Sequence, residues 1–225
     1  MAAVWASLTP LIVAGLVLPS FLIAEVLLLR SEGGRAKTVA FVAGFVVTKL
    51  VQGLVFGLLL SGANRGAPHA ISSTIAGTVL VIAGIIFYAM AAEAIFLHGA
   101  AGEGITRLFG AMDTVTSWRA FGIGIAAVLT SMRLWVFTLG AVAVIQEGDL
   151  GRLPASLTFV AFVLLSLAPM IVIAIVPFVA TRRPDSVPGA LHAWLAREHR
   201  WILAGLGLVL GTALLLLGLG KLGVF

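Results

Sequence analysis

Two cationic side chains, Lys49 and Arg133, stand near the middle of long apolar stretches of this sequence. A charge at mid-membrane depth costs at least about 3 kcal/mol on insertion scales, so each is expected to face protein, water or a ligand rather than lipid. Gln52 follows Lys49 by three positions and so shares its helix face, and Ser131 stands beside Arg133. These residues predict a binding site for an anionic head group, because a carboxylate, a sulfate or a phosphate would each suit such donors.

Two acidic side chains, Glu25 and Glu93, lie within other apolar stretches, each about one helical turn from an end. We predict that they gate the entrance to the site or carry protons. Two alternatives stay open. The carboxylates could reach the nearby membrane surface through their flexible stems, or they could pair with Lys49 and Arg133 in buried salt bridges that only hold helices together.

Four prolines are expected to break the helices near this site. Pro10 and Pro19 lie in the first apolar stretch, and Pro169 and Pro177 lie in the fifth. Each proline removes a backbone donor and leaves a carbonyl group free. Broken helices in corresponding places mark the substrate sites of many transporters, whereas ordinary kinks, which membrane helices tolerate, are the alternative.

The composition predicts a membrane protein made of helices. Of the 225 residues, 61% are hydrophobic and only 10% are charged, whereas a soluble domain has about 25% charged residues. Only helices and closed barrels satisfy their own backbone polar groups within a bilayer, and the long apolar stretches suit helices. We therefore predict an all-α, multi-pass protein with a single membrane domain, residues 1–225, and six transmembrane helices. The predicted helices are residues 5–29, 38–60, 71–97, 120–146, 155–180 and 201–220.

The basic residues between the apolar stretches predict the orientation. Most fall in the first, third and fifth loops, which the positive-inside rule assigns to the cytoplasmic face of a plasma (inner) membrane protein. Both termini are then expected outside. Within the third and fifth loops, residues 103–117 and 187–199 have apolar side chains at helical spacing, which is typical of short helices lying in the membrane interface.

Short matches indicate that the second half of the sequence repeats the first. The matching pairs, in chain order, are residues 18–20 with 129–131, residues 41–43 with 159–161, and Gly77 and Gly84 with Gly211 and Gly218. An odd number of spans in each half would place the two halves in opposite orientations. We therefore predict a 3+3 inverted repeat, an arrangement that many transporters use.

Signatures of an enzyme are absent from the sequence. It contains no cysteine, which excludes disulfides and thiol redox chemistry, and its four histidines lack the spacing of metal ligands. It also has no glycine-rich phosphate loop. We expect no catalytic residues, no cofactor and no metal site. Because the basic residues follow a membrane-topology pattern, we expect no nucleic-acid partner either.

The run from Leu108 to Gly124, followed by Ser131-Met132-Arg133, resembles the GAP (peptidoglycolipid-addressing, or sulfolipid-addressing) family of the LysE exporter superfamily. The similarity covers most of the chain. That family usually shows Asn-Pro-Lys in the fourth helix, so this chain keeps the cation but lacks the proline. The resemblance implies a six-helix inner-membrane protein of actinobacterial type that exports or flips a cell-envelope glycolipid.

The residues and the resemblance together favour a plasma-membrane exporter or flippase of an anionic amphiphile, a cell-envelope glycolipid or its precursor. Its expected partners are membrane lipids and lipid-synthesis or export machinery. A second hypothesis is a LysE-like exporter of amino acids or another small solute, with the glutamates as ligands. A third is a scaffold that transports nothing and holds a lipid-synthesis or export complex. The spacing of Gly53 and Gly57 suits helix packing within one chain or in an oligomer.

Overall fold

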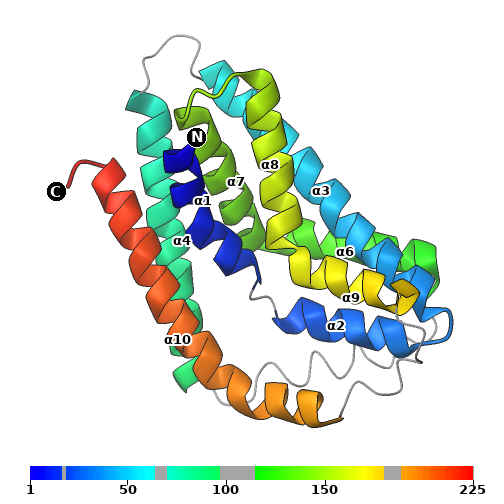
Figure 1. Cartoon of the computed structure of the whole chain (residues 1–225). Helices are drawn as coiled ribbons and strands as arrows, with labels where there is room; N and C mark the ends of the chain where they lie inside the picture. The colour runs from blue at the N-terminus through cyan, green and yellow to red at the C-terminus, as the bar shows by residue number, and fades with distance from the viewer. Residues whose placement is uncertain (17–18, 64–69, 97–114, 180–188, 225) are drawn as a thin grey trace.

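The computed structural model describes residues 1–16, 19–63, 70–96, 115–179 and 189–224, and its regular structure in those ranges is entirely helical. The helices are α1 (Ala2–Leu16), α2 (Pro19–Arg30), α3 (Gly34–Ala63), α4 (Ala70–Phe96), α6 (Ser117–Thr130), α7 (Met132–Glu147), α8 (Arg152–Ser166), α9 (Ala168–Val179) and α10 (Gly189–Lys221). The long helices α4 and α10 lie side by side along one edge, while the shorter α2, α6 and α9 lie across the bundle (Figure 1). The all-α prediction is confirmed for these residues.

Three of the predicted transmembrane segments are bent pairs of helices. The two helices meet at 49° in α1–α2, at 74° in α6–α7 and at 68° in α8–α9. By length and apolar character, α3 could cross a membrane alone, and each bent pair could do so if its two helices form one span. Helical structure therefore coincides with every predicted segment, while the number of six crossings and their orientation stay predictions.

Two of the four prolines mark bends and two do not. Pro19 is the first residue of α2 and Pro169 is the second residue of α9, where a missing N–H costs no helical hydrogen bond. Pro10 lies inside α1 and Pro177 inside α9, and both helices continue past them. The prediction of helix breaks at Pro10 and Pro177 was therefore wrong. One proline removes one backbone hydrogen bond, which neighbouring helices can compensate.

The bend between α6 and α7 forms without a proline. Ser131 has extended backbone angles, φ −89° and ψ 97°, which end α6 and begin α7. The indole N–H of Trp135 donates to the carbonyl oxygen of Leu129 at 3.0 Å. This bond gives a partner to one of the carbonyl groups that the end of a helix leaves free, so the chain stabilises the bend with a side chain.

Replacing Trp135 with phenylalanine should therefore lower the free energy of unfolding by about 0.5–1.5 kcal/mol, the usual net value of one hydrogen bond. Phenylalanine would keep an aromatic ring beside Phe56, whose ring centroid lies 5.8 Å away, but would leave Leu129 without its donor. Thermal unfolding in detergent measures the change. Trp118 is 79% exposed on α6 and serves as the matched control. An equal loss in Trp118→Phe would contradict the capping role of Trp135.

Glycines bring α4 and α10 together in a reciprocal pattern. A methyl group on Gly77 would lie 3.0 Å from the carbonyl oxygen of Gly218, and one on Gly84 would lie 2.9 Å from that of Gly211. The flanking side chains follow the same exchange, with Leu222 against Gly77, Tyr88 against Gly211, Leu215 against Gly84 and Val81 against Gly218. These are the glycines whose spacing matches between the two halves of the sequence.

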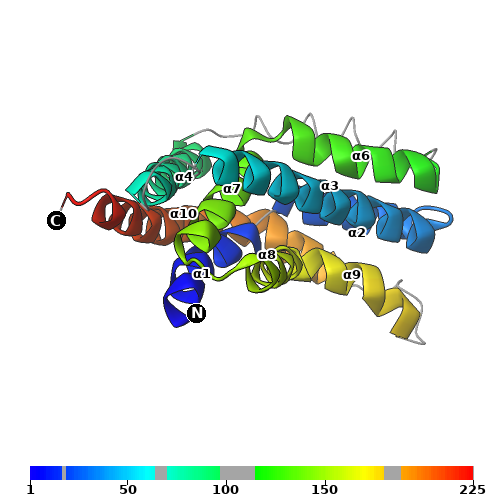
Figure 2. The same ribbon diagram turned by 90° about the horizontal axis from the view of Figure 1, so that it is seen from above.

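Helices α3 and α6 also meet backbone to backbone, and they run side by side in Figure 2. A methyl group on Gly44 would lie 2.4 Å from the carbonyl oxygen of Phe121, and one on Gly124 would lie 2.3 Å from that of Phe41. Small residues at both positions are what allows this approach. The contact fixes α6, and hence the bend at Ser131, against the first half of α3.

The predicted interfacial segments are only partly described. Residues 103–114 lie outside the described ranges. Helix α10 begins at Gly189 and continues to Lys221, so residues 189–199 are helical but belong to the same helix as the sixth predicted span. Their side chains, and that of Glu93 in α4, lie outside the described residues. The interfacial location of both segments and the role of Glu93 stay predictions.

Candidate anion-binding site

A small cavity lies where the three bends meet. Gly15 near the end of α1, Leu134 at the start of α7, and Ser166 and Leu167 at the α8–α9 bend line it, and Lys49 reaches it from the middle of α3. The remaining lining is apolar and consists of Leu11, Phe137 and Phe162. Its volume of about 10 Å³ is about the room that one water molecule needs.

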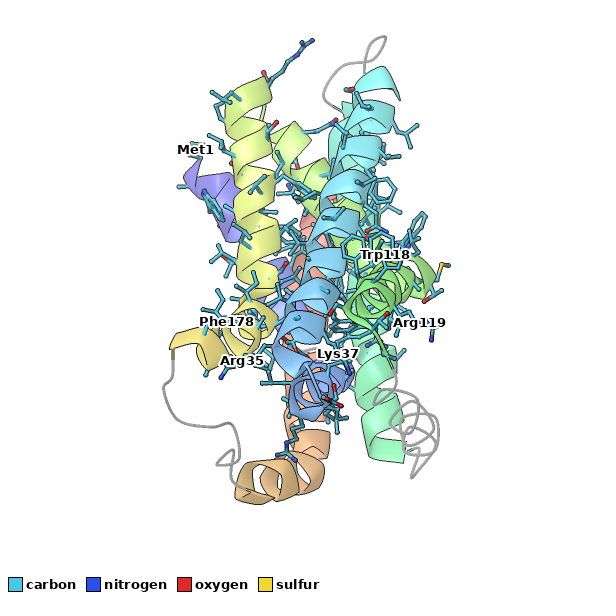
Figure 3. The ribbon with its side chains drawn as sticks, turned by 90° about the vertical axis from the view of Figure 1, so that its right-hand side faces the viewer. Met1, Arg35, Lys37, Trp118, Arg119 and Phe178 are labelled. Atoms are coloured by element: carbon cyan, nitrogen blue, oxygen red, sulfur yellow. The ribbon has the colours of Figure 1, made fainter. Side chains whose placement is uncertain are left out.

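Side-chain contacts hold the bundle together on both sides of this cavity. Toward the turn between α2 and α3, Arg35 lies over the ring of Phe178 on α9, 6.0 Å from its centroid, and Figure 3 shows the two side chains beside each other. Toward the opposite end of α3, the Gln146 side chain of α7 donates to the carbonyl oxygen of Gly57 at 2.8 Å.

Lys49 brings an amine to the cavity without a carboxylate partner. Its side chain is 3% exposed, and its Nζ donates to Thr138 Oγ1 at 2.8 Å and to the Leu134 carbonyl oxygen at 3.1 Å. It forms no ion pair with any residue that the structure describes, and the salt bridge with Glu25 considered from the sequence is absent. An ammonium group has three donors, so one of them has no protein acceptor within the described ranges.

Thr138 links Lys49 to Gln52. The Thr138 hydroxyl accepts from Lys49, donates to the Leu134 carbonyl oxygen at 2.8 Å, and lies 3.4 Å from Gln52 Oε1. Gln52 is 6% exposed, and its Nε2 has no hydrogen-bond partner among the described residues. Exchanging the amide oxygen and nitrogen would leave the oxygen without a partner instead. One polar end of Gln52 is therefore unpaired in either orientation.

Thr138 is a site residue that the sequence analysis missed. A threonine in an apolar helix ordinarily bonds to the carbonyl group four residues earlier, as Thr138 does, and so carries no separate signal. One feature of the sequence could have indicated Thr138: it is the only hydroxyl-bearing residue between Arg133 and Gln146. Its position on the face shared with Leu134 became informative only once α3 was packed against α7.

Arg133 and Ser131 lie at the α6–α7 bend but are not part of the cavity lining. Both residues are half-buried, and Ser131 makes no side-chain capping hydrogen bond to α7. Arg133 precedes Leu134, whose carbonyl oxygen accepts from Lys49, so both predicted cations belong to the surroundings of one bend. Binding of a single head group by both of them stays a prediction.

Glu25 is fully buried in α2, and neither of its carboxyl oxygens has a hydrogen-bond partner within the described part of the chain. The alternative in which Glu25 reaches the membrane surface is therefore wrong. Thr38 of α3 is also 0% exposed, and its hydroxyl is likewise without a partner in those ranges. Buried polar groups without partners are rare and call for an explanation.

Two helix N-termini adjoin the cavity. Leu134 is the third residue of α7, and Leu167 immediately precedes α9. The free N–H groups and the macrodipole at a helix N-terminus favour a bound anion. Within the described ranges, no group of His, Asp and Glu side chains could hold a metal ion. The charged group that lines the cavity is the Lys49 amine, which suits an anion.

The chain is similar to known proteins at the level of a family. A model of the family described as Sap, sulfolipid-1-addressing protein, matches residues 8–220 of the chain. No curated protein and no solved structure matches it. The matched range includes Lys49, Gln52, Thr138 and all three bends.

Proposed function

Because the chain belongs to the Sap, sulfolipid-1-addressing protein, family, we propose that it exports or flips an anionic amphiphile, a cell-envelope glycolipid or its precursor, across the plasma membrane. Membership of this family agrees with the resemblance to the sulfolipid-addressing proteins seen in the sequence. The family description supports a lipid-related role for a protein of apolar helices. Lys49 and Gln52 bind the head group, with Arg133 and Ser131 beside them.

One observation carries this proposal: Lys49 is buried at the cavity shared by three bent helices and has no carboxylate partner among the described residues. A buried cation is tolerated when it is paired or when it serves a function. Here two neutral acceptors hold the amine, and one donor is left over beside the cavity. A negatively charged head group would supply the missing acceptor and the missing charge.

The reciprocal packing of α4 and α10 supports the predicted inverted repeat, while the location of both termini outside rests on the basic residues between the apolar stretches. If Gly77 corresponds to Gly211 and Gly84 to Gly218, exchanging the two halves turns the contact between Gly77 and Gly218 into the contact between Gly211 and Gly84. Both contacts occur. Such self-complementary contacts are typical of a two-fold axis. Transporters of this kind bind their substrates at the interface between repeats.

Glu25, and Glu93 by analogy, carry protons or gate the cytoplasmic entrance. Glu25→Gln keeps the shape of the side chain but cannot release a proton, so we expect transport to fall while the amount of folded protein stays the same. Transport by purified protein under an imposed pH gradient measures the effect. Glu32→Gln is the matched control because Glu32 is exposed in the turn between α2 and α3. Unchanged transport in Glu25→Gln would remove Glu25 from the mechanism.

Purified protein in liposomes tests the proposed function directly. The probe is a short-chain fluorescent galactosylceramide that carries a sulfate on its sugar, and its movement between leaflets is followed by chemical quenching of the outer leaflet. The same lipid without the sulfate is the control, because it keeps the tails and the sugar but removes the charge. We expect transport of the sulfated lipid only.

Two outcomes would contradict the proposal. Equal movement of both lipids would mean that no anionic head group is recognised. Movement of neither lipid, together with flux of radiolabelled lysine, would favour the exporter of small solutes instead.

A further inference from the structure

The match between the second and fifth predicted spans gives Lys49 a counterpart in the other half of the chain. The shift that aligns Phe41 with Phe159 aligns Lys49 with Leu167. The burial pattern follows the same shift from position 44 to position 52, although Val42 is buried and its counterpart Val160 is exposed. Gly44, Phe45, Thr48, Lys49 and Gln52 are buried on α3, and so are their counterparts Phe162, Val163, Ser166, Leu167 and Met170.

Corresponding hydroxyl groups of the two segments also bond to their own helix, although the acceptors differ, four residues earlier in α3 and three residues earlier in α8. The hydroxyl of Thr48 donates to the carbonyl oxygen of Gly44 at 2.7 Å, and that of its counterpart Ser166 donates to the carbonyl oxygen of Val163 at 3.0 Å. The main difference between the two segments is their shape, because α3 is continuous whereas α8 and α9 bend at Leu167. The proline that follows the bend explains this difference, since the corresponding residue of α3 is a valine, whose N–H can take part in a continuous helix.

Lys49 and Leu167 line the same cavity. In a molecule built from two inverted copies, corresponding residues that meet in one place lie beside the axis that relates the copies. The cavity is therefore the place that both halves share. Leu167 occupies the position that a second copy of Lys49 would have, and in this chain an apolar side chain stands there.

We propose that position 167 is equivalent to position 49 as a place for the cation that binds the cargo. The leucine at position 167 then determines which head-group charge the protein selects. This inference rests on the proposed function. Arg133 lies outside the cavity lining, so the lining itself has a cation at one of the two equivalent positions and suits a head group with a single negative charge, such as a sulfate ester. A lysine at both positions would suit a doubly charged head group, such as a phosphate monoester at neutral or higher pH.

Moving the lysine from position 49 to position 167 tests whether the two positions are equivalent. The experiment compares the wild-type protein with Lys49→Leu, with K49L/L167K and with K49L/L11K, using the fluorescent sulfated galactosylceramide in liposomes. Leu11 lines the same cavity but is not the counterpart of Lys49. We expect Lys49→Leu to lose transport and K49L/L167K to regain about 10-fold, as one restored charge-assisted hydrogen bond would give. K49L/L11K should stay at the level of Lys49→Leu.

Two results would overturn the inference. One is folded K49L/L167K that transports no better than Lys49→Leu, and the other is equal recovery in K49L/L11K. If the wild-type protein itself does not move the probe, the proposed function fails instead, which separates the two claims.

A thiol variant covers the case in which lysine at position 167 prevents folding. The sequence has no cysteine, so K49L/L167C carries one thiol, which aminoethyl methanethiosulfonate converts to an ammonium group after folding. Recovery with this reagent, and none with its uncharged methyl analogue, would support the inference. Equal effects of the two reagents, or no modification of the thiol during transport, would overturn it.

Discussion

Replacing Lys49 with methionine should lower transport of the sulfated lipid by about 10- to 150-fold, which corresponds to the roughly 1.5–3 kcal/mol that a hydrogen bond to a charged group contributes. Methionine has a similar length and suits a buried position, so the amount of folded protein should not fall. The loss should be specific to the charged head group, because the acyl chains and the sugar do not depend on the amine. Initial rates in liposomes, normalised to folded protein, measure the change.

A second lysine controls for the general effect of losing a positive charge. Lys221 is half-buried at the end of α10, where it pairs with Glu147, and it does not line the cavity. Lys221→Met should keep transport near the wild-type rate. If Lys49→Met transports the sulfated lipid as fast as the wild-type protein, the head group does not bind at the meeting point of the three bends.

Replacing Gly124 with valine should destabilise the protein by about 1–3 kcal/mol or more, the usual cost of overpacking. A methyl group at this position would lie 2.3 Å from the carbonyl oxygen of Phe41, and a carbonyl group of α3 cannot rotate away as a side chain could. Helix α6 must therefore separate from α3, which would also displace the bend at Ser131. A lower midpoint of thermal unfolding in detergent, together with a loss of transport, is the expected result.

The control for this substitution lies half a turn away on the same helix. Gly122 is exposed, and a methyl group there would meet no atom within 4 Å. Gly122→Val should unfold within a degree or two of the wild-type protein, since surface substitutions ordinarily change stability by less than about 0.5 kcal/mol. Equal stability of Gly124→Val and Gly122→Val would mean that α3 and α6 do not pack as closely as described.

The sequence predicted the helices of this fold better than the bends between them. Apolar length was sufficient to find the helical segments, and two of the four prolines, Pro19 and Pro169, do lie at bends. The bend at Ser131 could not be predicted, because it depends on the Trp135 side chain reaching back to a carbonyl group that only the bend itself leaves free. Breaks were predicted at Pro10 and Pro177 but the helices continue past both, because neighbouring helices decide whether one missing hydrogen bond breaks a helix.

The candidate site was predicted in the same partial way. Spacing alone placed Lys49 and Gln52 on one helix face, and the structure places both at the same hydrogen-bonded group. Thr138 was missed because its role requires α7 to pack against α3 at one particular register. The lack of a partner for Glu25 among the described residues could not be predicted either. A sequence shows that a carboxylate lies in an apolar stretch but not whether a cation lies beside it.

An experimental structure of the protein with the sulfated galactosylceramide would test the central claim most directly. We predict that an oxygen of the sulfate group lies within hydrogen-bond distance of Lys49 Nζ, in a widened cavity between the bends of α1–α2, α6–α7 and α8–α9. A head group bound elsewhere, with the Lys49 amine still held only by Thr138 and the Leu134 carbonyl oxygen, would contradict it.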